Sequence, residues 1–452
     1  MKHLESNSLD ALRDALRHMD DGFSALPPFT ASATGADRIQ PVLLEAAERL
    51  RDNYPYFHPL YAGQMLKPPH PVARAAYALA TWVNPNNHAL DGGRASSAME
   101  KEAVAGIAAM FGWAEFLGHL TGGGTMANLE ALWVAGRLAP GKVTVASASA
   151  HYTHGRISGV LQLPFESIPV TMDGRMDMGA LEQRAERGDI GCVVATLGTT
   201  GTGSVDPLPQ ILRLRERFGF RVHVDAAYGG YFTLADNLAP ETRAAFDCAG
   251  QADSIVIDPH KHGLQPYGCG CVLFRDPAVG ALYKHDSPYT YFSSKDLHLG
   301  EISLECSRPG AAAVALWATQ RLLPLVRDGE FAADLAQSRA AALEFVERLR
   351  GDSRWMVPLM PELDIVVWAH RAETAAAVSE LSQKIFDRAA ARNLHLALIR
   401  LPVRYFPQLL PDDGSGTVLC LRSVLMKPEH LQWIHQIFDL LSTIVGECLT
   451  PD

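Results

Sequence analysis

The feature that most constrains the fold is a regular alternation of apolar runs with segments of helical period, between the Pro-rich stretch "HPLYAGQMLKPPHP" and about residue 320. The apolar runs that read as strands are "GKVTVASASAH", "GCVVATLGTTGTG", "FRVHVDAAYGG", "SIVIDPHK" and "CGCVLFRD". Between them, "TMANLEALWVAGRLA" and "LPQILRLRERFG" have helical spacing, and Gly219 ends the second where a glycine commonly follows a helix. Such alternation predicts an α/β fold, a mostly parallel sheet covered by helices.

The pattern differs at both ends of the chain, which predicts a division into three parts. Residues 1–72 read as an N-terminal helical segment that includes "PVLLEAAERLRD". Residues 73–322 hold the alternating pattern and form the large domain. The stretch "GAAAVALWATQRLLPLVRDG", expected as one long helix, spans the end of this domain, and the pattern changes after it. Residues 323–452 mix helices such as "EHLQWIHQIFDLLSTIV" with short strands such as "LDIVVWAH" and "TVLCLRSVLM", typical of a small α+β C-terminal domain.

Composition and charge narrow the class of protein. A net charge of -10 argues against nucleic acid or an acidic membrane as the main partner. No apolar run reaches the roughly 18–20 residues that cross a bilayer, and no signal-peptide pattern opens the chain, so we expect a cytoplasmic protein. The seven cysteines are scattered and are expected to be reduced. Cys269 and Cys271 lack a second pair at zinc spacing, so we predict core packing there and no metal site.

Polar residues gather where the predicted strands end, which is where ligands bind in open parallel sheets. The residues at these ends are His151, Thr200, Asp225, Ala227, Asp258, His260 and Lys261. Ahead of them, "LTGGGTMANLEAL" places Gly124 and Thr125 at the start of a helix, where free amides suit a phosphate. Taken singly, each feature is more often a turn residue, a helix cap or a structural histidine.

Together these residues predict one ligand, pyridoxal 5'-phosphate. Lys261 supplies an amine that forms a Schiff base with the cofactor aldehyde, and Asp225 keeps the ring nitrogen protonated so that the ring withdraws electrons. His151 and the methyl group of Ala227 offer flat surfaces above and below the ring.

The chain resembles the group II pyridoxal-phosphate-dependent amino-acid decarboxylases, which include the aromatic-amino-acid, tyrosine, glutamate and cysteine-sulfinate decarboxylases. The resemblance rests on "HVDAAYGG", on the lysine of "DPHKHG" that follows its aspartate 36 positions later, and on "ATLGTTGTGSVD". It extends from "FHPLYAGQM" to "LRSVLMKP", most of the chain. It implies the aspartate-aminotransferase-like fold (fold type I) and a homodimer with active sites at the subunit interface.

The resemblance also implies roles for individual residues. The cofactor residues are Lys261 for the Schiff base, Asp225 for the ring nitrogen, His151 for stacking, Gly124, Thr125 and His260 for the phosphate, and Thr200 for the phenolic oxygen. Gln64 and Arg422 match positions that meet a substrate carboxylate, and Tyr289 or Tyr291 falls in a mobile catalytic loop. Asp258 stands where asparagine is common in the animal enzymes, and Arg94 where proline is common.

The predicted function is decarboxylation of an L-amino acid to the amine and carbon dioxide through an external aldimine. Tyr61, Trp82 and "SPYTYF" suit an aromatic side chain, whereas Arg94 and Arg422 suit an acidic one, so both substrate classes stay open. The alternatives are a carbon–carbon lyase or aldolase of the sphingosine-phosphate lyase type, an aminotransferase, and a non-catalytic descendant of such an enzyme.

Overall fold

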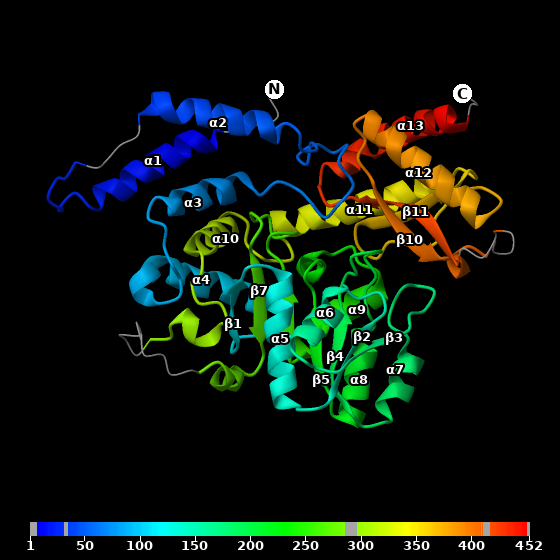
Figure 1. The fold of residues 1–452 in the computed structure, drawn as a ribbon, viewed down its shortest axis with the longest axis horizontal. Helices are drawn as coiled ribbons and strands as arrows, with labels where there is room; N and C mark the ends of the chain where they lie inside the picture. The colour runs from blue at the N-terminus through cyan, green and yellow to red at the C-terminus, as the bar shows by residue number, and fades with distance from the viewer. Residues whose placement is uncertain (1–6, 31–34, 285–295, 408, 410–415, 450–452) are drawn as a thin grey trace.

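The computed structural model describes residues 7–30, 35–284, 296–407, 409 and 416–449. Within these ranges the chain forms a seven-stranded sheet and a separate four-stranded sheet. Figure 1 shows the large sheet in the lower half of the molecule and the small sheet, with its helices, at the upper right.

The large sheet is built from the alternating region. Its strands, in spatial order, are β1 (Leu117–Thr121), β7 (Gly270–Phe274), β6 (Ser254–Ile257), β5 (Arg221–Asp225), β4 (Ile190–Thr196), β2 (Val143–Ser147) and β3 (Phe165–Ile168). The pairs from β6 to β3 are parallel, whereas β7 is antiparallel to both of its neighbours. The mostly parallel sheet is therefore present. The sequence analysis did not identify the two edge strands, β1 and β3.

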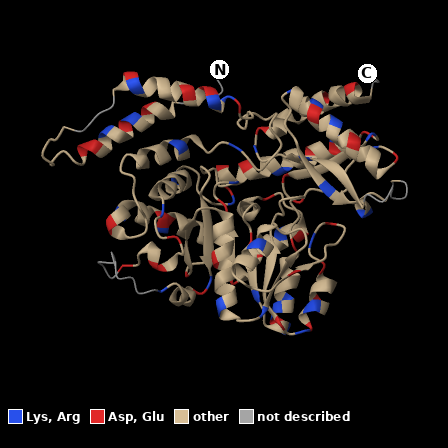
Figure 2. Cartoon of the chain, viewed as in Figure 1, with Lys and Arg blue, Asp and Glu red and all other residues tan. Residues whose placement is uncertain are grey.

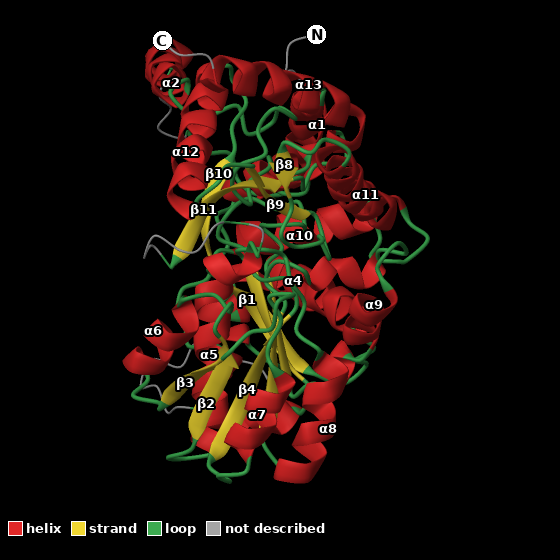
Figure 3. Ribbon diagram, turned by 90° about the vertical axis from the view of Figure 1, so that its right-hand side faces the viewer, coloured by secondary structure: helices red, strands yellow, loops and turns green. Residues whose placement is uncertain are grey.

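Helices cover both faces of this sheet, as Figure 3 shows with α5 and α6 on one side and α8 and α9 on the other. The helices that connect these strands are α5 (Gly124–Leu138), α6 (Thr153–Val160), α7 (Met178–Ala185), α8 (Leu208–Phe218) and α9 (Pro240–Asp247). Every residue of β2, β4, β6 and β7 is buried, as expected of strands covered on both faces. Figure 2 agrees, since charged residues lie mainly on helices and loops.

Among the described residues, four helices precede β1: α1 (Ser8–Asp21), α2 (Ala36–Leu50), α3 (Pro71–Thr81) and α4 (Leu90–Met110). Helices α3 and α4 both contact α10 (Gly310–Leu322), which follows the large sheet in the sequence, and α1 contacts α3. Neither α1 nor α2 buries a residue, although both have apolar side chains along one face.

The small sheet has the order β10 (Ala397–Pro402), β11 (Thr417–Val424), β9 (Ile365–His370) and β8 (Trp355–Met356), all antiparallel. Its helices are α11 (Glu330–Arg350), α12 (Ala375–Ala391) and α13 (His430–Leu449). The expected single helix over "GAAAVALWATQRLLPLVRDG" was wrong in its last seven residues: α10 ends at Leu322. The reason is Pro324, which disfavours the helical conformation at the preceding residue, and Leu323 has φ -123° and ψ 82°.

No helix in the described part of the chain is both long enough and apolar enough to cross a membrane.

Candidate functional site

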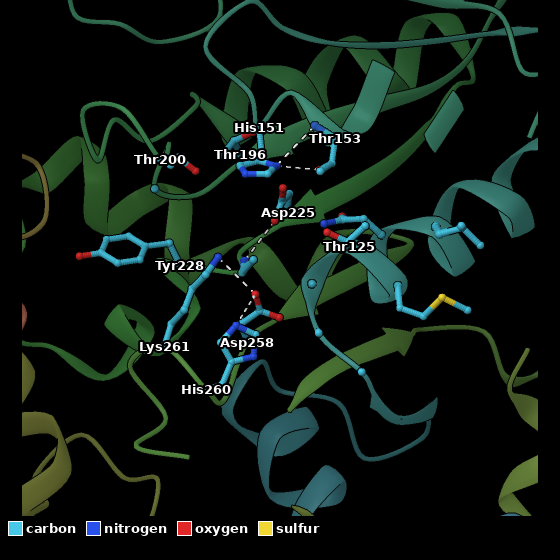
Figure 4. A pocket seen from close by; sticks show the side chains of 18 of the residues that line it. Thr125, His151, Thr153, Thr196, Thr200, Asp225, Tyr228, Asp258, His260 and Lys261 are labelled. Carbon is cyan, nitrogen blue, oxygen red and sulfur yellow. Dashed lines mark hydrogen bonds and ion pairs between the residues drawn. The ribbon is translucent and has the colours of Figure 1, made fainter. Parts of the chain in front are cut away.

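The strand ends of the large sheet and the start of α5 enclose a cavity of about 580 Å³. Nine residues that the sequence analysis singled out line it: Gly124, Thr125, His151, Thr200, Asp225, Ala227, Asp258, His260 and Lys261. These residues come from five separate stretches of the chain, because parallel strands deliver their carboxyl ends to one edge of the sheet. Figure 4 shows His151, Asp225 and Lys261 converging on the same space.

Lys261 lies on the turn that follows β6, a strand whose residues are all buried. The turn is closed by the Lys261 amide, which donates to the carbonyl of Asp258 at 2.9 Å. The Lys261 Nζ atom is 3.2 Å from Asp258 Oδ2, and the side chain keeps 19% of its surface exposed. Asp258 is also 3.6 Å from His260 Nε2, so its carboxylate lies between two possible cations. This arrangement makes Asp258 the ionic partner of the lysine.

The glycine turn before α5 packs tightly against Asp258. A Cβ atom on Gly124 would lie 2.5 Å from Asp258 Oδ2, and Gly123 has φ 138°, which side chains other than glycine rarely adopt. The first amides of α5 therefore approach the cavity without a side chain in between. An anion at this helix N-terminus would be favoured by those amides and by the helix dipole.

Asp225 ends β5, and both of its carboxylate oxygens are engaged. Oδ1 accepts from the amide of Ala227 at 3.1 Å, and Oδ2 accepts from His154 Nε2 at 2.8 Å. Burial alone would raise the pKa of Asp225. The hydrogen bond and charge of His154, with Lys261 and His223 further off, instead hold this pKa well below its usual range. The cavity is therefore lined by a buried carboxylate that stays ionised.

His151 presents its ring to the same cavity from the segment between β2 and α6. Its Nδ1 atom is 2.7 Å from Thr153 Oγ1, a contact that fixes the orientation of the ring. Burial lowers the pKa of His151, which favours the neutral imidazole. A neutral ring held in this way is suited to stacking on a flat aromatic ligand.

The residues expected to meet a substrate carboxylate lie outside the set that lines this cavity. Arg422, on β11, is buried, and its Nη2 atom donates to the carbonyl of Thr200 at 2.7 Å. Arg422 is therefore not a solvated surface residue. Gln64 is exposed, and Arg94 is exposed on α4 beside a different cavity.

Tyr289 and Tyr291 lie outside the described residues.

Sequence reasoning missed three residues at the site. His154 follows His151 by three positions, and that helical spacing was the available signal. Tyr228 lines the cavity, and its hydroxyl donates to Asp364 Oδ1 at 2.5 Å. Asp364 precedes β9 in the other sheet, so no local pattern connects it with Tyr228.

These residues suit pyridoxal phosphate. The cavity offers a lysine amine, a buried ionised carboxylate with acceptor capacity beyond its two protein donors, and a helix N-terminus for a phosphate. In the described part of the chain Asp258 Oδ1 is buried without a hydrogen-bond partner, so an acceptor in the cavity lining is left for a group that the protein does not supply.

Comparison with known proteins agrees with this chemistry. A family described as "Pyridoxal-dependent decarboxylase conserved domain" matches residues 133–371, more than half of the chain. The L-tyrosine decarboxylase of Enterococcus faecium is 28% identical, over 96% of this chain and 89% of that protein. The probable L-tyrosine/L-aspartate decarboxylase of Methanothermobacter thermautotrophicus is 27% identical, over 78% of this chain and 96% of that protein.

Solved structures give the same fold. Mouse CSAD superposes with a TM-score of 0.77 at 18% identity, over 97% of this chain and 99% of that chain. Oryza sativa TDC, solved with PLP and tryptamine, also gives 0.77 at 18% identity, over the full length of both chains. The predicted aspartate-aminotransferase-like fold (fold type I) is confirmed.

Proposed function

Because this chain belongs to the pyridoxal-dependent decarboxylase family and is a pyridoxal-phosphate-dependent carboxy-lyase acting on an amino acid, we propose that its substrate is an L-amino acid with an aromatic or an acidic side chain. The observation that carries the proposal is the pairing, in one cavity, of the Lys261 amine with the buried, ionised Asp225 carboxylate. In this proposal the two residues perform different tasks on one cofactor.

Pyridoxal phosphate, when bound, supplies an aldehyde that condenses with amines and a ring that accepts the electrons of the breaking bond. Lys261 would hold the cofactor through Nζ, and Asp225 would keep the ring nitrogen protonated. The amides at the start of α5, with Thr125 and His260, would bind the phosphate. His151 and Ala227 would contact the ring, and the partly apolar lining of the cavity would limit access of water to the departing carboxylate.

Arg422 is our candidate for binding a substrate carboxylate, with Gln64 as a second one. The Nε atom of Arg422 is buried and has no hydrogen-bond partner among the described residues, so this guanidinium retains donor capacity. Proton delivery to the substrate carbon is assigned to Tyr289 or Tyr291, as the family resemblance implies.

The names of the relatives support both substrate classes, since they include an L-tyrosine decarboxylase and probable L-tyrosine/L-aspartate decarboxylases. The deciding experiment is an amino-acid panel assayed for carbon dioxide release by the purified protein with pyridoxal phosphate. It should contain L-tyrosine, L-tryptophan, L-aspartate, L-glutamate and L-cysteine sulfinate, with D-tyrosine and D-aspartate as controls. Release from one L-class and from neither D-control is expected. Release from none of the L-amino acids would contradict the proposal.

Product analysis separates the alternatives. A carbon–carbon lyase would yield an aldehyde from a phosphorylated amino alcohol without carbon dioxide. An aminotransferase would yield a keto acid and would require a second keto acid as acceptor. Stoichiometric amine and carbon dioxide would exclude both.

We further propose a cytoplasmic homodimer. All seven cysteines are free, as suits a reducing compartment. Support for the dimer comes from the apolar side chains that α2 leaves uncovered, namely Ile39, Val42, Leu43, Leu44 and Leu50.

A further inference from the structure

A second histidine, His154, contacts the site from behind the cavity. It lies on the first turn of α6 with none of its surface exposed, and it does not line the cavity itself. Its Nε2 atom is 2.8 Å from Oδ2 of Asp225, which is only 4% exposed. A buried histidine with such a partner either only fills space in the core or fixes the orientation and charge of the carboxylate.

The direction of the hydrogen bond follows from the donor and acceptor chemistry. An ionised carboxylate only accepts, so Nε2 of His154 carries the proton and donates it to Oδ2. The other ring nitrogen, Nδ1, is buried without a hydrogen-bond partner among the described residues. The contact with Asp225 is thus the polar anchor of this imidazole ring.

The carboxylate of Asp225 is held at two points, one on each oxygen. The Ala227 amide fixes Oδ1 and His154 fixes Oδ2, so rotation about the Cβ–Cγ bond would break at least one of these bonds. A carboxylate has about four acceptor positions, so both oxygens can still accept from a group in the cavity. Charge-assisted hydrogen bonds of this kind are stronger and geometrically more specific than neutral ones.

The neighbouring histidine does not share this task. His223 precedes Asp225 on β5, but its Nδ1 atom is 2.9 Å from Ser254 Oγ and its Nε2 atom is 2.8 Å from Asn128 Oδ1. Both of its ring nitrogens are therefore committed elsewhere. Among the described residues, His154 is the side chain that hydrogen-bonds directly to the Asp225 carboxylate.

We propose that His154 is a positioning residue that holds the Asp225 carboxylate, ionised and correctly oriented, against the ring nitrogen of pyridoxal phosphate. The inference rests on the proposed role of Asp225 and extends it: protonation of the ring nitrogen depends on a histidine that never touches the cofactor.

Two amide variants test this, because they differ in where they place the donor. The side-chain nitrogen of His154→Gln can reach the position of Nε2, whereas that of His154→Asn falls short of Oδ2. The readouts are the dissociation constant for pyridoxal phosphate and the ¹⁵N chemical shift of the ring nitrogen in bound ¹⁵N-labelled cofactor. Asp225→Asn gives the reference signal for loss of the carboxylate charge.

We expect His154→Asn to weaken cofactor binding at least tenfold and to move the ¹⁵N shift toward that of Asp225→Asn, while His154→Gln retains most of both properties. The matched control is His119→Asn, since His119 is fully buried and its Nε2 atom is 3.0 Å from Glu130, away from the cavity. This control should lower the melting temperature and leave the ¹⁵N shift unchanged.

Wild-type affinity and ¹⁵N shift in His154→Asn would overturn the inference and leave His154 as a packing residue. Equal losses in the Asn and Gln variants would overturn it as well, because the position of the donor would then not matter. Neither result touches the proposed function, which fails separately if the wild-type protein binds no pyridoxal phosphate and releases no carbon dioxide.

Discussion

At the scale of single residues, Lys261 gives the most direct test of the site. Replacement of Lys261 by alanine removes the amine. The fold should survive because the Lys261 side chain is partly exposed, and because Asp258, its ion-pair partner, still has His260 close to its carboxylate in the variant. Borohydride reduction of the wild-type protein with pyridoxal phosphate should attach the pyridoxyl group to Lys261, as read by peptide mass mapping. The Lys261→Ala variant should give no labelled peptide. Normal labelling of another lysine in that variant would show that the site lies elsewhere.

Arg422 tests the substrate-binding part of the proposal. We expect Arg422→Lys to raise KM strongly while the absorbance of the bound cofactor stays unchanged, because lysine keeps the charge but not the planar, two-pronged donor geometry. The loss in kcat/KM should be about 2–4 kcal/mol, the range for a buried charge-assisted contact.

The structure adds a second task for Arg422, because its contact with the Thr200 carbonyl joins the small sheet to the large domain. Steady-state kinetics and thermal unfolding on the same preparation separate the two tasks. A lower melting temperature with unchanged KM would leave Arg422 as a structural link between the two sheets.

Residues at the ends of strands that line the cavity could be predicted from the sequence. Residues whose role depends on a partner far away in the sequence could not. Lys261 and Asp225 could be identified from the sequence because each stands at the end of a predicted strand. The pairing of Tyr228 with Asp364 spans 136 positions and two sheets, so only the tertiary structure reveals it. His154 was missed although it follows His151 by three positions, because its contact with Asp225 joins residues 71 positions apart in the sequence.

At the scale of elements, prediction succeeded where burial dictates the pattern. The central strands β4 and β6 are largely apolar because they are covered on both faces, and their positions were expected. The edge strand β3 has two exposed residues out of four and therefore lacks the apolar signal. The antiparallel direction of β7 could not be predicted, since its sequence is apolar whichever way it runs.

The junction between β11 and α13 contains a buried lysine with a measurable consequence. Lys427 is 4% exposed, and its Nζ atom donates to the carbonyl of Tyr61 at 2.6 Å. Burial, together with the charge of Lys67, lowers the pKa of Lys427 to about 7. Between pH 7 and 10 the unfolded chain therefore binds a proton at this position that the folded protein does not, so this lysine makes the free energy of unfolding rise with pH.

We expect Lys427→Met to remove that rise. Relative to the variant, the wild-type free energy of unfolding should increase by up to about 1.4 kcal/mol per pH unit between pH 7 and about 10, and the difference should become constant below pH 7, where Lys427 is protonated in both the folded and the unfolded chain. Urea unfolding at pH 7, 8 and 9 measures it, with Lys142→Met, at an exposed lysine, as the control. A pH-independent difference between wild type and Lys427→Met would contradict the assignment.

At the scale of the whole molecule, the N-terminal helices α1 and α2 bury no residue within a single chain. Figure 1 shows α1 and α2 lying along the outside of the molecule, with α3 beneath them. On α2, Val42 and Leu43 are 64% and 63% exposed, and Leu50 is 66% exposed. Burying such side chains stabilises by about 25 cal/mol per Å² of apolar area, so a second copy that covers them would gain substantially.

We therefore expect the protein to be a homodimer that depends on α2. Light scattering should give twice the mass of one chain, and the double variant Val42→Glu/Leu43→Glu should shift the population toward monomer, because an interface must desolvate the two new charges. Carbon dioxide release should fall together with the dimer fraction if the active sites lie at the subunit interface. Gln40→Glu, at an exposed polar position of the same helix, is the matched control and should stay dimeric. A wild-type protein that is monomeric and fully active would exclude the dimer, while a double variant that stays dimeric would move the interface away from α2.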